Sequence, residues 1–176
     1  MKIISSLTLL ILVATNTLSV SAQDQQTAFF DSLSALCGES FEGRMTFPEE
    51  GQDNFAGKRL VATIKTCTDT EIRMPFHVGE DHSRTWIISK TEAGIELKHD
   101  HRHHDGTPDE INMYGGLAGS NGSAARQSFF ADAHTATIIP EARTNVWTIS
   151  LSEDKSSLTY HLERNSAPRF TAKLAR

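Results

Sequence analysis

Short runs of residues with a two-residue hydrophobic period fill the chain from Phe41 onward, and this rhythm limits the fold more than any other feature. Successive side chains of a β-strand point to opposite faces, so such runs predict half-buried strands. Turns rich in Gly, Pro, Asn, Asp and Ser separate the runs at regular intervals. The expected strands are residues 41–46, 58–68, 71–78, 84–90, 95–104, 127–130, 134–139, 144–151, 157–164 and 169–174.

Most connections between these strands are short, which favours pairing of consecutive strands in antiparallel fashion. We therefore expect an all-β fold, an antiparallel up-and-down β-barrel of about nine to ten strands. A β-sandwich or jelly roll is the alternative that fits the same strand spacing.

One short helix is expected before the strands, over residues 27–37. Its apolar residues recur at helical spacing and share one face, and Gly38 is a typical residue for the end of a helix. The members of this stripe are Phe29, Phe30, Leu33, Leu36 and Cys37.

The first 22 residues have the pattern of a secretory signal peptide. Lys2 is followed by an apolar segment over residues 7–13 and by small residues at Val20-Ser21-Ala22, where cleavage is expected. Residues 23–176 would then form a single domain in a secreted or periplasmic protein. The apolar segment is shorter than the roughly 20 residues that a membrane-spanning helix needs.

The only two cysteines, Cys37 and Cys67, both lie in the part expected to be exported. An even number of cysteines in an oxidising compartment predicts a disulfide bond, and there is no Cys-x-x-Cys redox motif. Two buried thiols are the alternative.

The formal net charge of −5 at pH 7, without any basic patch, excludes the partners that need positive charge. We expect neither nucleic acid nor an anionic membrane surface as a partner. A small-molecule ligand or a metal ion is expected instead.

Four of the eight histidines fall within the six residues 99–104, at the end of an alternating run. His99, His101 and His103 share one strand face with Ile95 and Leu97, and this apolar pair marks the face as inward. Neutral imidazole is a common ligand of zinc and other divalent transition metals. Residues i and i+2 lie about 6.6 Å apart along a strand, so two such imidazoles can converge on one ion.

A divalent transition metal held by His99 and His101 is therefore one hypothesis, with zinc the preferred ion. The third ligand would be His103 or a histidine of another strand, and the sequence does not choose among them. Asp100 and Asp105 are candidate carboxylates for orienting the imidazoles. The histidines from other strands are His77, His82, His134 and His161.

Two further interpretations of the histidines stay open. They can line a cavity as hydrogen-bonding groups for an organic ligand, with apolar walls from Phe76, Trp86, Tyr114 and Trp147. They can also form a plain polar rim, where exposed ion pairs contribute little to stability.

One connection is much longer than the others, from Asp105 to Ala125, and it is rich in glycine. A long connection inside a compact domain is usually functional or disordered. Because this segment begins where the histidine strand ends, we expect an ordered lid over the mouth of the barrel.

The initial helix ending at Leu36-Cys37-Gly38, the following Phe41-Glu42-Gly43 and the succession of strands resemble the calycin barrels. Calycins are lipocalins and fatty-acid-binding-like proteins, and the resemblance implies one barrel around a ligand cavity. The chain lacks the lipocalin Gly-x-Trp signature. Separately, residues 98–103 with Asp105-Gly106 are similar to a run in uncharacterised secreted bacterial proteins, which implies no activity.

The expected function is therefore that of a secreted or periplasmic binding protein with a His-rich site at the barrel mouth. The alternative is a metal-dependent enzyme, cupin-like or a metal-assisted hydrolase or lyase, that uses the same histidines. Gly94, His99-x-His101 and Asp105 are similar to the first half of a cupin metal motif. Pro140–Asn145 lacks the histidine of the second half.

Overall fold

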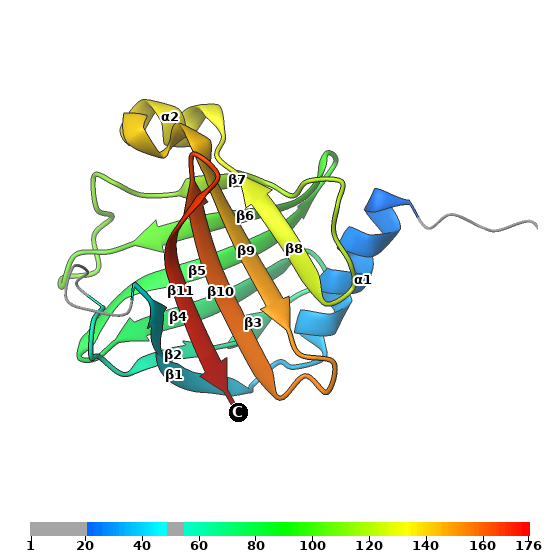
Figure 1. The fold of residues 1–176 in the computed structure, drawn as a ribbon, viewed down its shortest axis with the longest axis horizontal. Helices are drawn as coiled ribbons and strands as arrows, with labels where there is room; N and C mark the ends of the chain where they lie inside the picture. Colours follow the sequence, from blue (N-terminus) through cyan, green and yellow to red (C-terminus); the bar gives the residue numbers. More distant parts are fainter. Residues whose placement is uncertain (1–20, 49–54) are drawn as a thin grey trace, which may run out of the picture.

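The computed structural model describes residues 21–48 and 55–176, and the expected signal peptide therefore lies almost entirely outside the described residues. All strands belong to one antiparallel sheet that curls into a nearly closed barrel (Figure 1). In chain order the elements are α1 (Ala22–Ser34), β1 (Ser40–Phe47), β2 (Leu60–Thr63), β3 (Thr66–Cys67), β4 (Glu71–Val78), β5 (Asp81–Thr91), β6 (Gly94–His101), β7 (Tyr114–Leu117), β8 (Arg126–Phe130), α2 (Ala133–Ile138), the 3₁₀ helix η1 (Pro140–Thr144), β9 (Asn145–Leu151), β10 (Ser157–Arg164) and β11 (Ala167–Ala175).

The order of neighbouring strands confirms an antiparallel barrel. The strands follow β7-β6-β5-β4-β2-β1-β11-β10-β9-β8, and β3 pairs with β4. The two ends of this order approach each other, since the Gly119 N–H donates to the Ser128 carbonyl at 2.9 Å and Ala118 forms an antiparallel bridge with Phe129. Closure of this kind leaves little unpaired strand edge exposed.

Strand alternation is as the hydrophobic period predicts. In β4 every second residue is buried, from Ile72 to Val78, and its bounds are those expected from the sequence. In β6 the side chains of Ile95, Leu97 and His99 are buried, which confirms the inward face of the histidine strand. The strand ends at His101, so His103 lies beyond it and is exposed.

Two expected strands differ from the structure. The run 58–68 is divided into β2 and β3, because Ile64 leaves the ladder and exchanges backbone hydrogen bonds with Gly38 and Glu39. The run 134–139 is wrong as a strand and forms α2 instead. Its start is fixed by the Asp132 carboxylate, which accepts a hydrogen bond from the Thr135 N–H at 2.7 Å, as an N-cap does.

The glycine-rich connection, expected to form an ordered lid, is ordered, and part of it is a strand of the barrel wall. Its middle residues form β7, which pairs with β6 in a register that sets Tyr114 opposite His99. A Cβ on Gly115 would lie 1.9 Å from the Leu97 carbonyl oxygen, and one on Gly116 equally close to that of Phe130. Gly115 therefore permits close approach of β7 to β6, and Gly116 permits close approach to β8 at the barrel seam.

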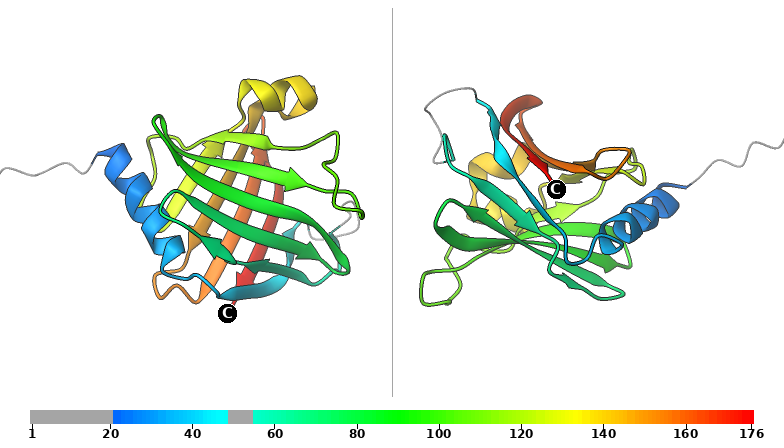
Figure 2. Two further views of the ribbon diagram at one scale, coloured as in Figure 1. Left: turned by 180° about the vertical axis from the view of Figure 1, so that it is seen from behind. Right: turned by 90° about the horizontal axis from the view of Figure 1, so that it is seen from below.

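Helix α1 closes one end of the barrel with its apolar face. Phe29, Phe30 and Leu33 are almost completely buried. The side chain of Gln26 accepts a hydrogen bond from the Ile95 N–H at 3.0 Å and donates one to the Gly119 carbonyl at 3.2 Å. Gln26 thus satisfies backbone groups near the barrel seam, where an unpaired buried group would be costly. Figure 2 shows α1 against one end of the barrel and α2 away from it.

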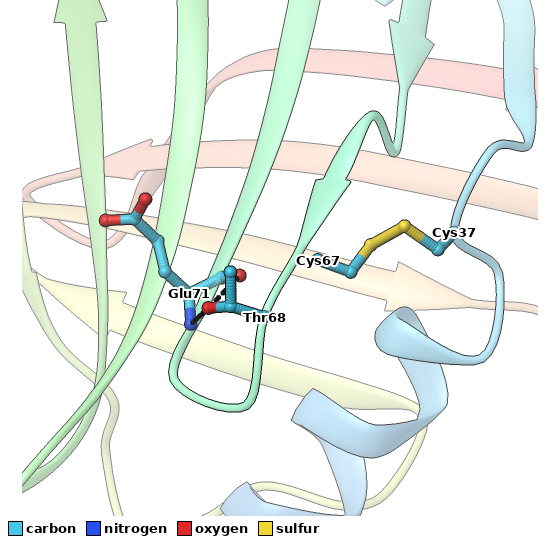
Figure 3. Close-up of a disulfide and its surroundings, with 4 residues drawn as sticks. All are labelled: Cys37, Cys67, Thr68 and Glu71. Carbon is cyan, nitrogen blue, oxygen red and sulfur yellow. Dashed lines mark hydrogen bonds between the residues drawn. A yellow bond between two sulfur atoms is a disulfide. The ribbon is translucent and has the colours of Figure 1, made fainter.

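The expected disulfide is present between Cys37 and Cys67 (Figure 3). Cys37 follows α1, and Cys67 ends β3 beside a tight turn in which the Glu71 N–H donates to the Thr68 hydroxyl. The bridge ties the helix to the barrel wall. In the described part of the chain, no helix combines the length and the apolar character needed to cross a membrane.

We predict that the double substitution Cys37→Ser, Cys67→Ser lowers the free energy of unfolding by about 3–4 kcal/mol, because the bridge restricts an unfolded loop of this length. The two cysteines are 30 residues apart. Urea denaturation followed by tryptophan fluorescence measures the change. Mass analysis after alkylation is the control: two reactive thiols in the non-reduced native protein would contradict the bridge.

Candidate functional site

The end of the barrel away from α1 contains a cavity of about 300 Å³. Its walls come from β4, β5, β6, β7, η1, β9, β10 and β11, so residues far apart in the sequence surround one space. The apolar lining is Phe55, Phe76, Trp86, Tyr114, Ile139, Ala142, Trp147, Tyr160, Leu162 and Phe170. The polar lining is Arg84, His99, His101, Asn145 and Arg164.

The four aromatic residues expected to line a cavity, Phe76, Trp86, Tyr114 and Trp147, all do so. The Trp86 ring stacks between two others, with centroids 4.3 Å from Phe76 and 4.4 Å from Tyr160. The walls are therefore flat ring faces at stacking distance.

His99 is held in the inner wall by two hydrogen bonds. Its Nδ1 lies 3.1 Å from the Tyr114 carbonyl oxygen, and its Nε2 lies 2.7 Å from the Tyr160 hydroxyl. A carbonyl only accepts, so Nδ1 carries the proton and Tyr160 donates to Nε2. Burial lowers the pKa of His99 to about 3. At neutral pH His99 is thus an uncharged imidazole whose two nitrogens are both occupied.

His101 lies nearer the mouth, opposite Arg84 on the neighbouring strand. Its Nε2 is 3.0 Å from the Tyr114 hydroxyl. Burial and the nearby Arg84 guanidinium lower the pKa of His101, and burial raises that of Tyr114 to about 12. Tyr114 therefore bridges the two histidines: its carbonyl holds His99 and its hydroxyl holds His101.

The two arginines of the cavity differ in their partners. Arg84 forms an ion pair with Asp81 and lies over the ring of Phe55, 5.5 Å from its centroid. Arg164 donates from Nε to the neutral side chain of Asn145 at 2.8 Å. It forms no ion pair with any residue in the described ranges.

The third histidine of the run, His103, lies outside the cavity. Its ring is close to two carboxylates of the β6–β7 loop, 4.0 Å from Asp109 and 3.7 Å from Glu110. These three residues could each offer one metal-ligand atom within 4.8 Å of the others. The structure thus separates His103 from His99 and His101, and a shared metal site of all three would require movement of the loop.

The expected alternative ligands and carboxylates also lie elsewhere. His77 and His82 stack on each other, with ring centroids 3.9 Å apart. Asp100 binds Arg102. The other three residues form hydrogen bonds of their own: His161 with the Thr171 hydroxyl, His134 with the Asn112 carbonyl, and Asp105 with the Thr107 N–H. None of these residues lines the cavity.

Sequence reasoning missed Tyr160, Arg84 and Arg164 as members of the site. Tyr160 lies two residues after buried Leu158, on the same face of β10, so its inward orientation was predictable. Its contact with His99 was not predictable, because β10 and β6 are four or more strands apart in the sheet order.

We predict that His99 makes stability depend on pH. Its pKa is depressed in the folded state, so the unfolded chain binds more protons below about 6.5 and stability falls as pH falls toward 3. The contribution approaches about 1.4 kcal/mol per pH unit. Urea denaturation between pH 6.5 and 4.5 should show a shallower slope for His99→Gln. His104→Gln, on an exposed residue, is the control. An unchanged slope in His99→Gln would refute the assignment.

Scans against protein-family models, curated protein sequences and solved structures found no match to this chain. The barrel is compatible with a calycin-like fold, and the function must be argued from the cavity itself.

Proposed function

We propose that this protein is a binding protein that holds a small organic molecule in the cavity of its barrel. The observation that supports this most is the cavity of about 300 Å³ walled by aromatic rings, with polar groups at a few places. Pockets of this size and composition are typical of small-molecule sites. The volume is near the lower end of that class, which favours a compact ligand.

The shape of the walls favours a flat ligand. Trp86, Phe76 and Tyr160 already stack on one another, and Tyr114 stacks on His99 with centroids 4.6 Å apart. An inserted ring would continue these stacks and gain contact over its whole face. A flexible chain would lose more conformational entropy for the same contact.

The state of the histidines favours binding over catalysis. A general acid or base works best with a pKa near the operating pH. His99, with a pKa of about 3, stays neutral near pH 7 and its nitrogens already have partners. It serves to keep the wall rigid and polar at one point.

The disulfide supports a secreted or periplasmic location as part of this proposal. Cys37 and Cys67 pair in the structure, and such bonds persist in oxidising compartments.

We predict that the neutral fluorescent probe N-phenyl-1-naphthylamine binds with one-to-one stoichiometry. Leu162→Phe should weaken it tenfold or more, because Leu162 lines the cavity and a larger side chain occupies ligand space. The matched control is Leu117→Phe, at a residue 40% exposed on β7. Probe fluorescence titration measures both. Equal binding by the two variants, or no saturable binding by the wild type, would refute a cavity site.

A second candidate function is binding of a divalent cation. The grouping of His103, Asp109 and Glu110 favours it, since imidazole and carboxylates together suit zinc and related ions. This set differs from the expected pair His99 and His101, whose use would require His99 to give up its bond to Tyr160.

We predict that tag-free protein takes up zinc by calorimetry at pH 7.5, and that His103→Ala weakens binding at least tenfold. His104→Ala, its exposed neighbour, should leave binding unchanged. Affinity should fall on acidification, because protons compete with the metal for the imidazole and carboxylate ligands. Loss of binding in His99→Ala or His101→Ala, with His103→Ala unaffected, would assign the ion to the cavity pair instead. No uptake by the wild type would remove both metal hypotheses.

A further inference from the structure

We infer that the ligand of the cavity is an anion, and that its negative group binds to the guanidinium of Arg164. This inference rests on the proposed function, because it concerns the chemistry of the molecule that the cavity holds. The expected ligand is a compact flat molecule with one acidic group such as a carboxylate or sulfonate.

The position of Arg164 is the first argument. It is the last residue of β10, is half-buried and lines the cavity. Its Nε donates to Asn145 at 2.8 Å, which fixes the base of the guanidinium group. No hydrogen bond within the described ranges uses its two terminal nitrogens. An arginine fork held in this way is suited to an oxyanion, which accepts two parallel hydrogen bonds.

The charge balance of the cavity is the second argument. Among the residues that the structure describes, its lining contains two arginines and no aspartate or glutamate, although the whole chain has a net charge of −5. Arg84 is neutralised by Asp81. Arg102, just beyond β6, is neutralised by Asp100. Within residues 21–48 and 55–176, the partner of the Arg164 side chain is the neutral Asn145.

The surroundings of this charge are the third argument. Trp147 and Leu162 line the same space, and Phe170 is another apolar wall. Such apolar walls reduce solvent screening, so an unpaired guanidinium there attracts an anion more strongly than one on an open surface. A surface arginine that merely covers apolar residues would not distinguish an anionic ligand from a neutral one.

A matched pair of probes tests the inference in the full mature chain. 8-Anilino-1-naphthalenesulfonate and N-phenyl-1-naphthylamine share one ring skeleton and differ by the sulfonate. We expect Arg164→Met to weaken the anionic probe tenfold or more and to change the neutral probe by less than twofold. Arg164→Lys should restore part of the anion affinity. Arg169→Met, at an exposed residue of β11, is the control and should leave both affinities unchanged.

The outcomes separate the inference from the function on which it rests. If the neutral probe binds the wild type and Arg164→Met weakens both probes equally, or neither, the anion assignment is overturned while the cavity site stands. If neither probe binds the wild type, the proposed function fails and the inference fails with it. Retained binding of the neutral probe by Arg164→Met also shows that the variant is folded.

Discussion

Closure of the sheet between β7 and β8 is the constraint on which the rest of this structure depends. Backbones approach closely on both sides of β7. A side chain on Gly116 would collide with the Phe130 carbonyl oxygen of β8 at the seam, and one on Gly115 would collide with the Leu97 carbonyl oxygen of β6. The pairing of β7 with β6, on the other side of the strand, sets Tyr114 opposite His99. Without β7 the cavity would lack both the carbonyl that holds His99 and the hydroxyl that holds His101. Strand β7 therefore both closes the barrel and completes the site.

The two ends of the barrel differ: a helix fills one, and the other contains the cavity. Helix α1 fills one end with Phe29 and Leu33, both without exposed surface. The other end is left with a cavity, and His99 lies on its wall with every hydrogen-bonding group satisfied. A buried imidazole lacking such partners would cost about 1–3 kcal/mol. Tyr160 therefore has two roles: its hydroxyl stabilises buried His99, and its ring forms part of the aromatic wall.

Local patterns predicted most of the strands, the inward face of the histidine run and the disulfide, because each depends on neighbours in the sequence or on a single pair. The failures arise from distant contacts. Residues 134–139 alternate like a strand, yet Asp132 caps a helix there and Thr135 bonds to Gly115 of β7. The sequence also does not show that neighbouring backbones lie against the glycines of the 105–125 segment, so the strand β7 within it was not predicted. His103 is separated from His99 because β6 ends at His101. The two-residue hydrophobic period does not predict where the strand ends.

The cavity divides recognition between shape and charge. Its rings determine which outline fits, and they carry no net charge. The pKa values of His99 and His101 are both lowered, which favours neutral imidazoles near pH 7. Asp81 cancels the charge of Arg84. For the described part of the lining, the net positive charge at neutral pH is then that of Arg164. Because a guanidinium does not titrate in this range, preference for an anion should persist from pH 6 to 8 and weaken with added salt.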